Sequence, residues 1–369
     1  MPLRVLIVPD KFKGTLTARA AALAIAKGWQ AARPADKLER LPMTDGGDGF
    51  GEVMGRLSGA TIQKIATIDA AGRPCRASWW WQPEQKLAII ESATVNALAR
   101  HGGFHPFELD TFGLGAVLQA ASAAGARRCL VGVGGSATND GGFGVARALG
   151  WTFLDRDGMA ITRWTELARL AALRAPRRKH WFRELIVAVD VQNPLLGARG
   201  CTRIYGPQKG LKPGDFPAAE KCLRRLAAVV EEHAACGYER EPGAGAAGGL
   251  GFGLRAFASA ELRPGFDLFA DAADLERRLA AADLVITGEG AIDQSSLMGK
   301  GAGRMARECL KRKIPCLGLA GFIAPGGRTE KCFTRVRGLT ELTSVENARN
   351  DAASWLEKLA EAMAREWRE

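Results

Sequence analysis

Residues 129–136 read Cys129-Leu130-Val131-Gly132-Val133-Gly134-Gly135-Ser136, an apolar run that passes directly into glycines and a serine. An apolar run without polar alternation predicts a strand buried on both faces, as in a mostly parallel sheet covered by helices. Alanine-rich segments at residues 18–32 and 115–126 predict such helices, and Thr17 is placed to cap the first of them. Similar apolar runs lie at residues 4–8, 87–90, 185–189 and 284–286. The alternation of strands and helices predicts an α/β fold.

Carboxylates follow four of these five runs, namely Asp10, Glu91, Asp190 and Glu289. In open α/β sheets the ligand binds beyond the carboxyl ends of the strands, so residues placed there point to a site. One acidic residue after a strand can simply cap a helix. Four of them favour a functional edge of the sheet.

Glycines cluster in four segments, at residues 45–49, 132–142, 243–249 and 288–301. Glycine lets the backbone approach a ligand closely, and successive N–H groups can then cradle phosphate oxygens. We therefore expect a bound nucleotide. A P-loop is excluded because Gly301 follows Lys300 where serine or threonine would be required. A G-x-G-x-x-A match at Gly132, with Asp155 downstream, leaves an NAD(P)-dependent oxidoreductase of a small hydroxy acid as an alternative.

The acidic and basic residues near these segments narrow the chemistry. Magnesium bound with ATP needs only one or two protein carboxylates, and the base near an acceptor hydroxyl is commonly an aspartate. An ammonium group can hold a phosphate or a substrate carboxylate. The candidates are Asp10, Asp45, Asp190, Glu289 and Asp293 among the acids, and Lys11, Lys13, Lys209 and Lys300 among the bases. The residues thus predict a nucleotide, Mg²⁺ and an anionic acceptor.

The net charge of +11 is compatible with a nucleic-acid surface, an anionic substrate or simply a basic protein. No Lys/Arg run is interleaved with aromatics, so we expect no nucleic-acid partner. The eight cysteines form no CxxC pair, and no stretch approaches the ~18 apolar residues of a membrane span. We expect a cytoplasmic monomer or homodimer that does not bind membranes. A ligand-binding protein without turnover stays a further alternative.

Six ordered blocks together resemble the bacterial glycerate kinases that phosphorylate the 2-hydroxyl. The blocks lie at residues 9–17, 45–49, 132–142, 190–195 with 206–210, 242–249 and 282–290 with Asp293 and Gly299-Lys300. The resemblance implies transfer of a phosphoryl group from ATP, with Mg²⁺, to D-glycerate, giving 2-phosphoglycerate. It also implies two α/β domains. Residues 1–65 and 275–369 would form a discontinuous Rossmann-like domain, into which residues 66–274 are inserted.

The same resemblance, with the positions of residues after strands and in glycine loops, gives each candidate a role. Asp190 is the base or orienting carboxylate, with a turn residue before Asn193-Pro194 as the structural alternative. The glycines at 243–249 could instead only permit close helix packing. The full assignment is Asp190, Lys13 and Lys300 as catalytic; Gly134, Gly135, Ser136, Gly243, Gly245 and Gly248 at the nucleotide; Asp10, Asn193 and Lys209 at the substrate; and Asp45, Glu289 and Asp293 at the metal.

Two positions depart from the pattern of the family. Lys11 stands where the family usually has serine, and Asp48 stands where it usually has glutamate. Asp48 keeps the charge but is one methylene shorter. Lys11 would add positive charge and could alter which hydroxy acid binds best if it faces the substrate.

Overall fold

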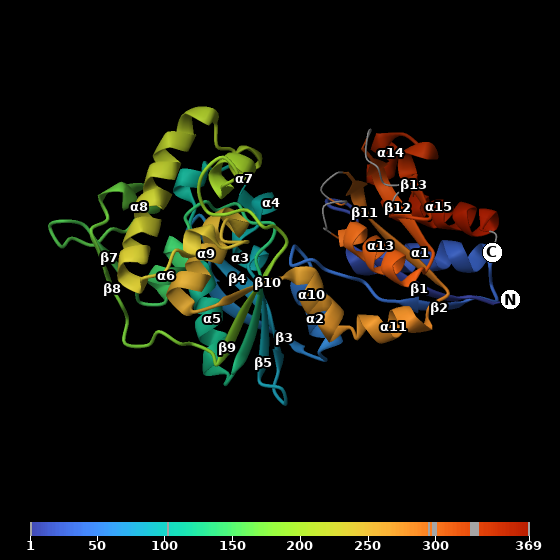
Figure 1. The fold of residues 1–369 in the computed structure, drawn as a ribbon, viewed down its shortest axis with the longest axis horizontal. Helices are drawn as coiled ribbons and strands as arrows, with labels where there is room; N and C mark the ends of the chain where they lie inside the picture. Colours follow the sequence, from blue (N-terminus) through green and yellow to red (C-terminus); the bar gives the residue numbers. More distant parts are fainter. Residues whose placement is uncertain (1, 102, 294–295, 297–300, 325–331, 368–369) are drawn as a thin grey trace. The chain divides into compact units, whose positions relative to one another are not determined.

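The computed structural model describes residues 2–101, 103–293, 296, 301–324 and 332–367 (Figure 1). The chain divides into two compact units, Met1–Asp45 with Phe266–Glu369 and Gly46–Gly265. Each unit carries its own sheet and helices, so the protein is α/β as the sequence predicts. The units are described one at a time.

The sheet of the first unit has the strand order β13-β12-β11-β1-β2, with every neighbouring pair parallel. Residues 5–8 and 284–287 of the central strands are buried, because helices cover the sheet. The strands are β1 (Arg4–Pro9), β2 (Lys37–Arg40), β11 (Leu284–Ile292), β12 (Cys316–Ile323) and β13 (Arg335–Gly338).

The helices of this unit lie on both faces of the sheet. The connections β1 to β2 and β11 to β12 run in opposite directions across it, so right-handed crossovers place α1 and α13 on opposite faces. Ile25 and Trp29 of α1 pack with Leu356 and Met363 of α15 in the core over β1, β11 and β12. The helices are α1 (Ala18–Ala32), α10 (Gly265–Ala272), α11 (Leu275–Ala281), α13 (Gly301–Arg312), α14 (Val345–Asn350) and α15 (Ala352–Glu366), with a 3-10 turn at Leu339–Glu341.

The main sheet of the second unit has the order β10-β9-β6-β5-β4-β3. Strands β10, β9, β6 and β5 are mutually parallel, whereas β4 pairs antiparallel with both β5 and β3. Its strands are β3 (Thr61–Ile68), β4 (Pro74–Gln82), β5 (Leu87–Glu91), β6 (Arg128–Gly132), β9 (Glu184–Val189) and β10 (Glu261–Pro264). Strands β7 (Thr152–Leu154) and β8 (Ala172–Arg174) form a separate antiparallel pair.

Helices of the second unit pack against this sheet and against each other. Leu114 of α5 and Leu250 of α9 join Val131 of β6 and Val187 of β9 in one core cluster. The helices are α2 (Phe50–Leu57), α3 (Ala93–Asn96), α4 (Leu98–His101), α5 (Phe112–Ala123), α6 (Phe143–Ala148), α7 (Cys201–Lys209), α8 (Phe216–Ala234) and α9 (Ala246–Ala258), with 3-10 turns at Pro106–Glu108, Trp164–Arg169, Pro213–Asp215 and Tyr238–Arg240.

The apolar runs of the sequence all form strands. The predicted strands 4–8, 87–90, 129–133, 185–189 and 284–286 appear as β1, β5, β6, β9 and β11. Helix α1 has the predicted bounds, and the Thr17 hydroxyl accepts the Ala20 N–H at 3.2 Å as its cap. The second predicted helix, residues 115–126, appears as α5 at Phe112–Ala123, so it starts and ends three residues earlier than expected; at its start the Asp110 carboxylate accepts the Phe112 N–H at 2.9 Å.

The boundaries between the two compact units lie at residues 45/46 and 265/266, whereas the sequence predicts domain boundaries at 65/66 and 274/275. Helix α2 packs on β4, where a Cβ on Gly51 would lie 1.8 Å from the Trp80 ring. Asp267 of α10 pairs with Arg304 of α13 at 2.8 Å. These contacts place α2 in the second unit and α10 in the first. Among the described residues, no helix is long and apolar enough to cross a membrane.

Candidate active site

In the first unit, two carboxylates lie beyond the centre of the sheet. Strands β1 and β11 pair in the register Pro9 to Gly288, so the next residues, Asp10 and Glu289, are neighbours. The Asp10 N–H donates to the Gly288 carbonyl at 2.8 Å and fixes this alignment. A Cβ on Gly301, the first residue of α13, would lie 3.2 Å from Asp10 Oδ2 and 3.4 Å from Glu289 Oε2. The two carboxylates therefore converge on one point.

The environment of this pair disfavours two negative charges. Burial raises the pKa of Asp10 well above its usual range, and the nearby Asp45 charge adds to the effect against the opposing charge of Lys11. Burial raises the pKa of Glu289 to about 7, and the charges of Asp45 and Asp293 add to this against a hydrogen bond from Ser296. Within the described part of the chain, Glu289 Oε1 is buried without a hydrogen-bond partner. A cation placed here would stabilise both ionised forms.

A short turn after β11 supports Glu289. The Ser296 N–H donates to Asp293 Oδ1 at 3.2 Å, and the Asp293 N–H donates to the Ser296 hydroxyl at 3.3 Å. Ser296 is buried and its hydroxyl also bonds the Glu289 carboxylate. The sequence analysis missed Ser296, although the i, i+3 spacing of Asp293 and Ser296 is a recognisable capping pattern.

The turn after β1 carries two of the predicted lysines. Phe12 pairs with Leu16 in a tight turn, and Lys13 lies exposed at its tip. Gly290 permits this turn to approach β11, since a Cβ there would lie 2.9 Å from the Lys13 backbone nitrogen. Lys11 is half-buried beside Asp10. The predicted catalytic Lys300 lies outside the described residues.

In the second unit, the glycine loop after β6 lies against residues 46–48. The Gly134 N–H donates to the Gly46 carbonyl at 3.1 Å, and a Cβ on Gly135 would lie 1.8 Å from Asp48 Oδ1. Ser136 is buried, and its hydroxyl lies 2.9 Å from that of Thr138. The expected phosphate loop is thus a tightly packed turn, and the helix expected after it, α6, starts only at Phe143.

Asp190 lies at the carboxyl end of β9, half-buried. Its charge adds to the burial that raises the pKa of Tyr205 to about 12, so the Tyr205 phenol lies near it and stays neutral. The Tyr205 hydroxyl donates to Asn193 Oδ1 at 2.6 Å, and Asn193 Nδ2 donates to the Arg199 carbonyl at 2.7 Å. Both polar atoms of Asn193 therefore hold the loop that follows Asp190.

The glycine run at 243–249 packs on this same loop. A Cβ on Gly245 would lie 2.3 Å from the Pro194 carbonyl oxygen, and the Gly245 N–H donates to the Asn193 carbonyl at 2.9 Å. A Cβ on Gly248 would lie 1.9 Å from the Thr138 carbonyl, and one on Gly243 would lie 2.9 Å from the Val189 side chain. These glycines permit close contacts within the unit.

Lys209 is buried beneath the 138–142 segment. Its ammonium donates to the Thr138 carbonyl at 2.7 Å. Burial lowers its pKa to about 8, against the opposing charges of Cys201 and Asp140. Beside it, Asn139 Nδ2 donates to the Thr202 hydroxyl at 3.1 Å. Lys209 thus joins the end of α7 to the loop that precedes α6.

Two further carboxylates that the sequence assignment omitted organise the backbone of this unit. Glu91 accepts the N–H groups of Gly49 and Gly51, both at 3.0 Å, and so caps α2. Asp140 is fully buried and accepts N–H bonds from Thr111, Gly142 and Gly144. The signal for Glu91 was its position directly after a strand. Nothing local distinguishes Asp140 from a turn residue.

Three or more His, Cys, Asp or Glu side chains do not gather in a metal-binding arrangement anywhere in the described part of the chain. The converging carboxylates of Asp10 and Glu289 nevertheless provide hard oxygen ligands of the kind that Mg²⁺ prefers. In magnesium–nucleotide sites, one or two protein carboxylates suffice because phosphate oxygens complete the coordination. The residues present therefore fit a metal that arrives with a nucleotide.

Comparison with known proteins gives a consistent picture. A family model described as the glycerate kinase family matches residues 5–368. The glycerate kinase of Bacillus subtilis (strain 168) is 34% identical over 374 residues, covering 98% of this chain and 97% of the relative. The glycerate 2-kinase of Escherichia coli (strain K12) is 34% identical over 329 residues, covering 87% and 86%. A crystal structure described as glycerate kinase 2 from Salmonella typhimurium LT2 superposes with a TM-score of 0.81 at 31% identity, covering 99% of this chain and 98% of that one.

Proposed function

This chain belongs to the glycerate kinase family, and from that premise we propose that it transfers the γ-phosphoryl group of ATP to the 2-hydroxyl of D-glycerate. The products are 2-phosphoglycerate and ADP. The observation within the molecule that carries the proposal is the convergence of Asp10 and Glu289 at the carboxyl ends of β1 and β11. This is the edge at which α/β sheets bind their ligands.

Asp10 and Glu289 would hold the magnesium ion of the nucleotide. Burial raises the pKa values of both groups, and neighbouring carboxylates add to the effect; a divalent cation would offset it. Asp45 and Asp293, the other carboxylates predicted at the metal, add negative charge around Glu289 that favours a cation. When bound, Mg²⁺ neutralises charge that develops on the transferred phosphoryl group. Lys13, exposed at the tip of its turn, and Lys300 contact phosphate oxygens.

Asp190 orients the acceptor hydroxyl and accepts its proton. The supporting geometry is the loop held by Tyr205 and Asn193, which fixes the backbone around Asp190 at the end of β9. A carboxylate within reach of the attacking hydroxyl is the usual arrangement for phosphoryl transfer to an alcohol. Asn193 and Lys209 act on substrate binding through the loops that they hold.

The nucleotide phosphates bind at the Gly134-Gly135-Ser136 turn through the N–H groups of Gly135 and Ser136, because the Gly134 N–H already donates to the Gly46 carbonyl. The run at 243–249 takes a supporting role in this proposal. The N–H groups of Ala244, Gly245 and Ala246 already donate to the carbonyls of Glu241, Asn193 and Gly243. They therefore serve the packing of α9 against the loop after Asp190.

The oxidoreductase alternative is not favoured. The family and the named relatives are kinases. In addition, Asp155 Oδ1 accepts the Asp157 and Met159 N–H groups in a turn after β7, which explains that carboxylate structurally. We also propose a cytoplasmic location, because the eight cysteines are free thiols of the kind that a reducing compartment maintains.

The deciding experiment follows ADP release from Mg-ATP with and without D-glycerate and identifies the phosphorylated carbon by phosphorus NMR. We expect glycerate-dependent ADP release and a product phosphorylated at the 2-position. A product phosphorylated at the 3-position would overturn the regiochemistry alone. ADP release that does not depend on glycerate would overturn the acceptor, and other hydroxy acids would then be screened.

A further inference from the structure

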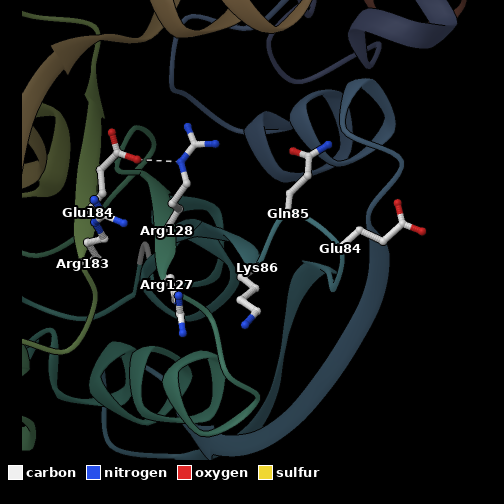
Figure 2. A pocket seen from close by; sticks show the side chains of 7 residues that line it. All are labelled: Glu84, Gln85, Lys86, Arg127, Arg128, Arg183 and Glu184. Carbon is white, nitrogen blue, oxygen red and sulfur yellow. Dashed lines mark hydrogen bonds and ion pairs between the residues drawn. The ribbon is translucent and has the colours of Figure 1, made fainter.

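A basic pocket lies in the second unit at the amino ends of β5, β6 and β9 (Figure 2). It has a volume of about 560 Å³, which is within the ordinary size range of small-molecule sites. The residues that line it are Glu84, Gln85, Lys86, Arg127, Arg128, Arg183 and Glu184. Four of these side chains carry positive charge and two carry negative charge.

Most of the positive charge in this pocket is not neutralised by neighbouring carboxylates. Arg128 pairs with Glu184 at 2.6 Å, as the dashed line in Figure 2 marks. Within the described part of the chain, Lys86, Arg127 and Arg183 form no ion pair. Figure 2 shows the side chains of Lys86 and Arg127 extending in the same direction, and Glu84 extending away from them. All three side chains are exposed, so an anion can reach them, and like charges without a carboxylate partner favour an anion.

Backbone hydrogen bonds hold the three segments that supply these cations. The Arg127 and Arg128 N–H groups donate to the Lys86 carbonyl at 2.9 and 3.1 Å. The Arg183 and Glu184 N–H groups donate to the Arg127 carbonyl at 2.8 and 3.1 Å. Lys86 itself has a φ of +48°, a left-handed conformation that the turn between β4 and β5 imposes. The cationic side chains thus project from a fixed frame.

We propose that this pocket binds a small polyvalent anion of the phosphate-ester or polyphosphate class, at a site separate from the candidate active site. Lys86, Arg127 and Arg183 supply the charge, and each guanidinium can donate two parallel hydrogen bonds to phosphate oxygens. A nucleic acid fits less well. No aromatic side chain lines the pocket to stack on bases, and Glu84 and Glu184 would repel a continuous phosphate backbone.

Within the second unit, the pocket and the residues proposed for the nucleotide and the acceptor lie at opposite ends of the same strands. Strands β5, β6 and β9 begin at the pocket and end before Glu91, the Gly134 loop and Asp190. Five or six residues of strand separate the two edges, which is about 15–20 Å. An anion in the pocket would therefore not touch Glu91, the Gly134 loop or Asp190.

The test measures binding of inorganic pyrophosphate by calorimetry to the full chain, in buffer with EDTA and without nucleotide or glycerate. The double variant Arg127→Ala/Arg183→Ala removes two pocket cations. The matched control, Arg177→Ala/Lys179→Ala, removes the same charge from exposed positions elsewhere in the same unit. We expect pyrophosphate to bind the double variant at least about tenfold more weakly than wild type, and the control variant with wild-type affinity. Thermal melting checks that each variant is folded, and Lys86→Ala replaces the double variant if it is not.

Three outcomes would overturn the proposal. In the first, pyrophosphate does not bind the wild type. In the second, the wild type and the double variant bind pyrophosphate with equal affinity. In the third, the control variant loses as much affinity as the double variant, which would indicate an effect of general surface charge. If wild type bound a single-stranded oligonucleotide but not pyrophosphate, and the double variant bound that oligonucleotide more weakly, the proposed ligand of the pocket would be a nucleic acid and not a small anion. Because no step requires ATP or glycerate, failure of the proposed kinase activity would leave this measurement intact.

Discussion

Asp10 and Glu289 stand side by side across the parallel strands β1 and β11, with their carboxylate oxygens converging on Gly301 at the start of α13. Residues 279 positions apart in sequence are brought together by one register of hydrogen bonds. Burial and mutual charge make this arrangement unfavourable for the free chain. Such destabilised carboxylates are a frequent property of functional sites, where a cation completes the charge balance.

The first prediction concerns the stability of the free protein. The folded pKa of Glu289 is about 7 against an ordinary value of 4.5, so between these values the folded chain keeps a proton that the unfolded chain loses. Stability therefore falls as pH rises through this window, and the full penalty is present above about pH 7. Glu289→Gln should remove the contribution of Glu289 to that pH dependence, leaving the contribution of Asp10, and stabilise the free protein at pH 8 by about 1–3 kcal/mol. Denaturant unfolding at pH 5 and pH 8 measures it.

The same substitution should damage turnover, because an amide cannot replace a charged metal ligand. We expect kcat/KM to fall about a hundredfold or more. Glu276→Gln, which changes an exposed carboxylate on α11 in the same unit, is the matched control and should alter neither property. A Glu289→Gln protein with the pH slope of wild type would contradict the assigned pKa.

The second prediction tests the role of Asp190. Asp190→Asn keeps the shape of the side chain but removes the base, so kcat should fall by about 10²–10⁴ while thermal stability changes little. Asp157→Asn, in an exposed turn of the same unit, is the control and should keep full activity. Steady-state kinetics and thermal melting provide the two readouts. Wild-type kcat in Asp190→Asn would leave Asp190 with only a turn role.

The third prediction separates packing from phosphate binding at the 243–249 run. Gly245→Ala forces a Cβ to within 2.3 Å of the Pro194 carbonyl, so we expect a loss of stability of about 1–3 kcal/mol. Gly214→Ala is matched, because its Cβ would meet nothing within 4 Å and neither glycine has positive φ. Melting curves and the KM for ATP are measured together. A raised KM at unchanged stability would instead indicate direct phosphate contact.

The sequence was sufficient for five buried strands. It did not predict others, such as β3 (Thr61–Ile68) and β12 (Cys316–Ile323), or the exact bounds of the second helix. An apolar run such as residues 284–286 forms a strand because both of its faces are covered, and no competing pattern exists. Helix α5 was placed three residues late because Gly113 and Gly115 weaken the helical signal, whereas the Asp110 cap acts through one backbone bond. Single capping bonds are easily missed in a glycine-rich stretch.

For the candidate site, residues that follow strands were predictable and residues that act across the fold were not. Asp10 and Glu289 were selected because the ends of parallel strands share one edge of the sheet. The 243–249 glycines could not be interpreted, because phosphate cradling and close packing both require the absence of a Cβ. The contact between Lys209 and Thr138 joins residues 71 positions apart, and no local pattern marks it.

The last prediction addresses Lys209, whose buried ammonium donates to the Thr138 carbonyl at 2.7 Å. Its pKa of about 8 lies below the ordinary 10.5, so between these values the unfolded chain holds a proton that the folded chain has lost. Wild-type stability should therefore gain a contribution of up to about 3 kcal/mol as pH rises from 8 to 10.5. Lys209→Met should lack that contribution, so the difference between the two unfolding curves isolates it.

Lys209→Met also distinguishes a loop-holding role from direct substrate contact. If the ammonium only holds the 138–142 segment, the variant should raise the KM for ATP and for glycerate together, because the segment loosens as a whole. Lys221→Met, at an exposed position on α8, is the control. A rise confined to the KM for glycerate would instead place the Lys209 ammonium on the substrate, since only loss of a direct charge contact affects one ligand alone.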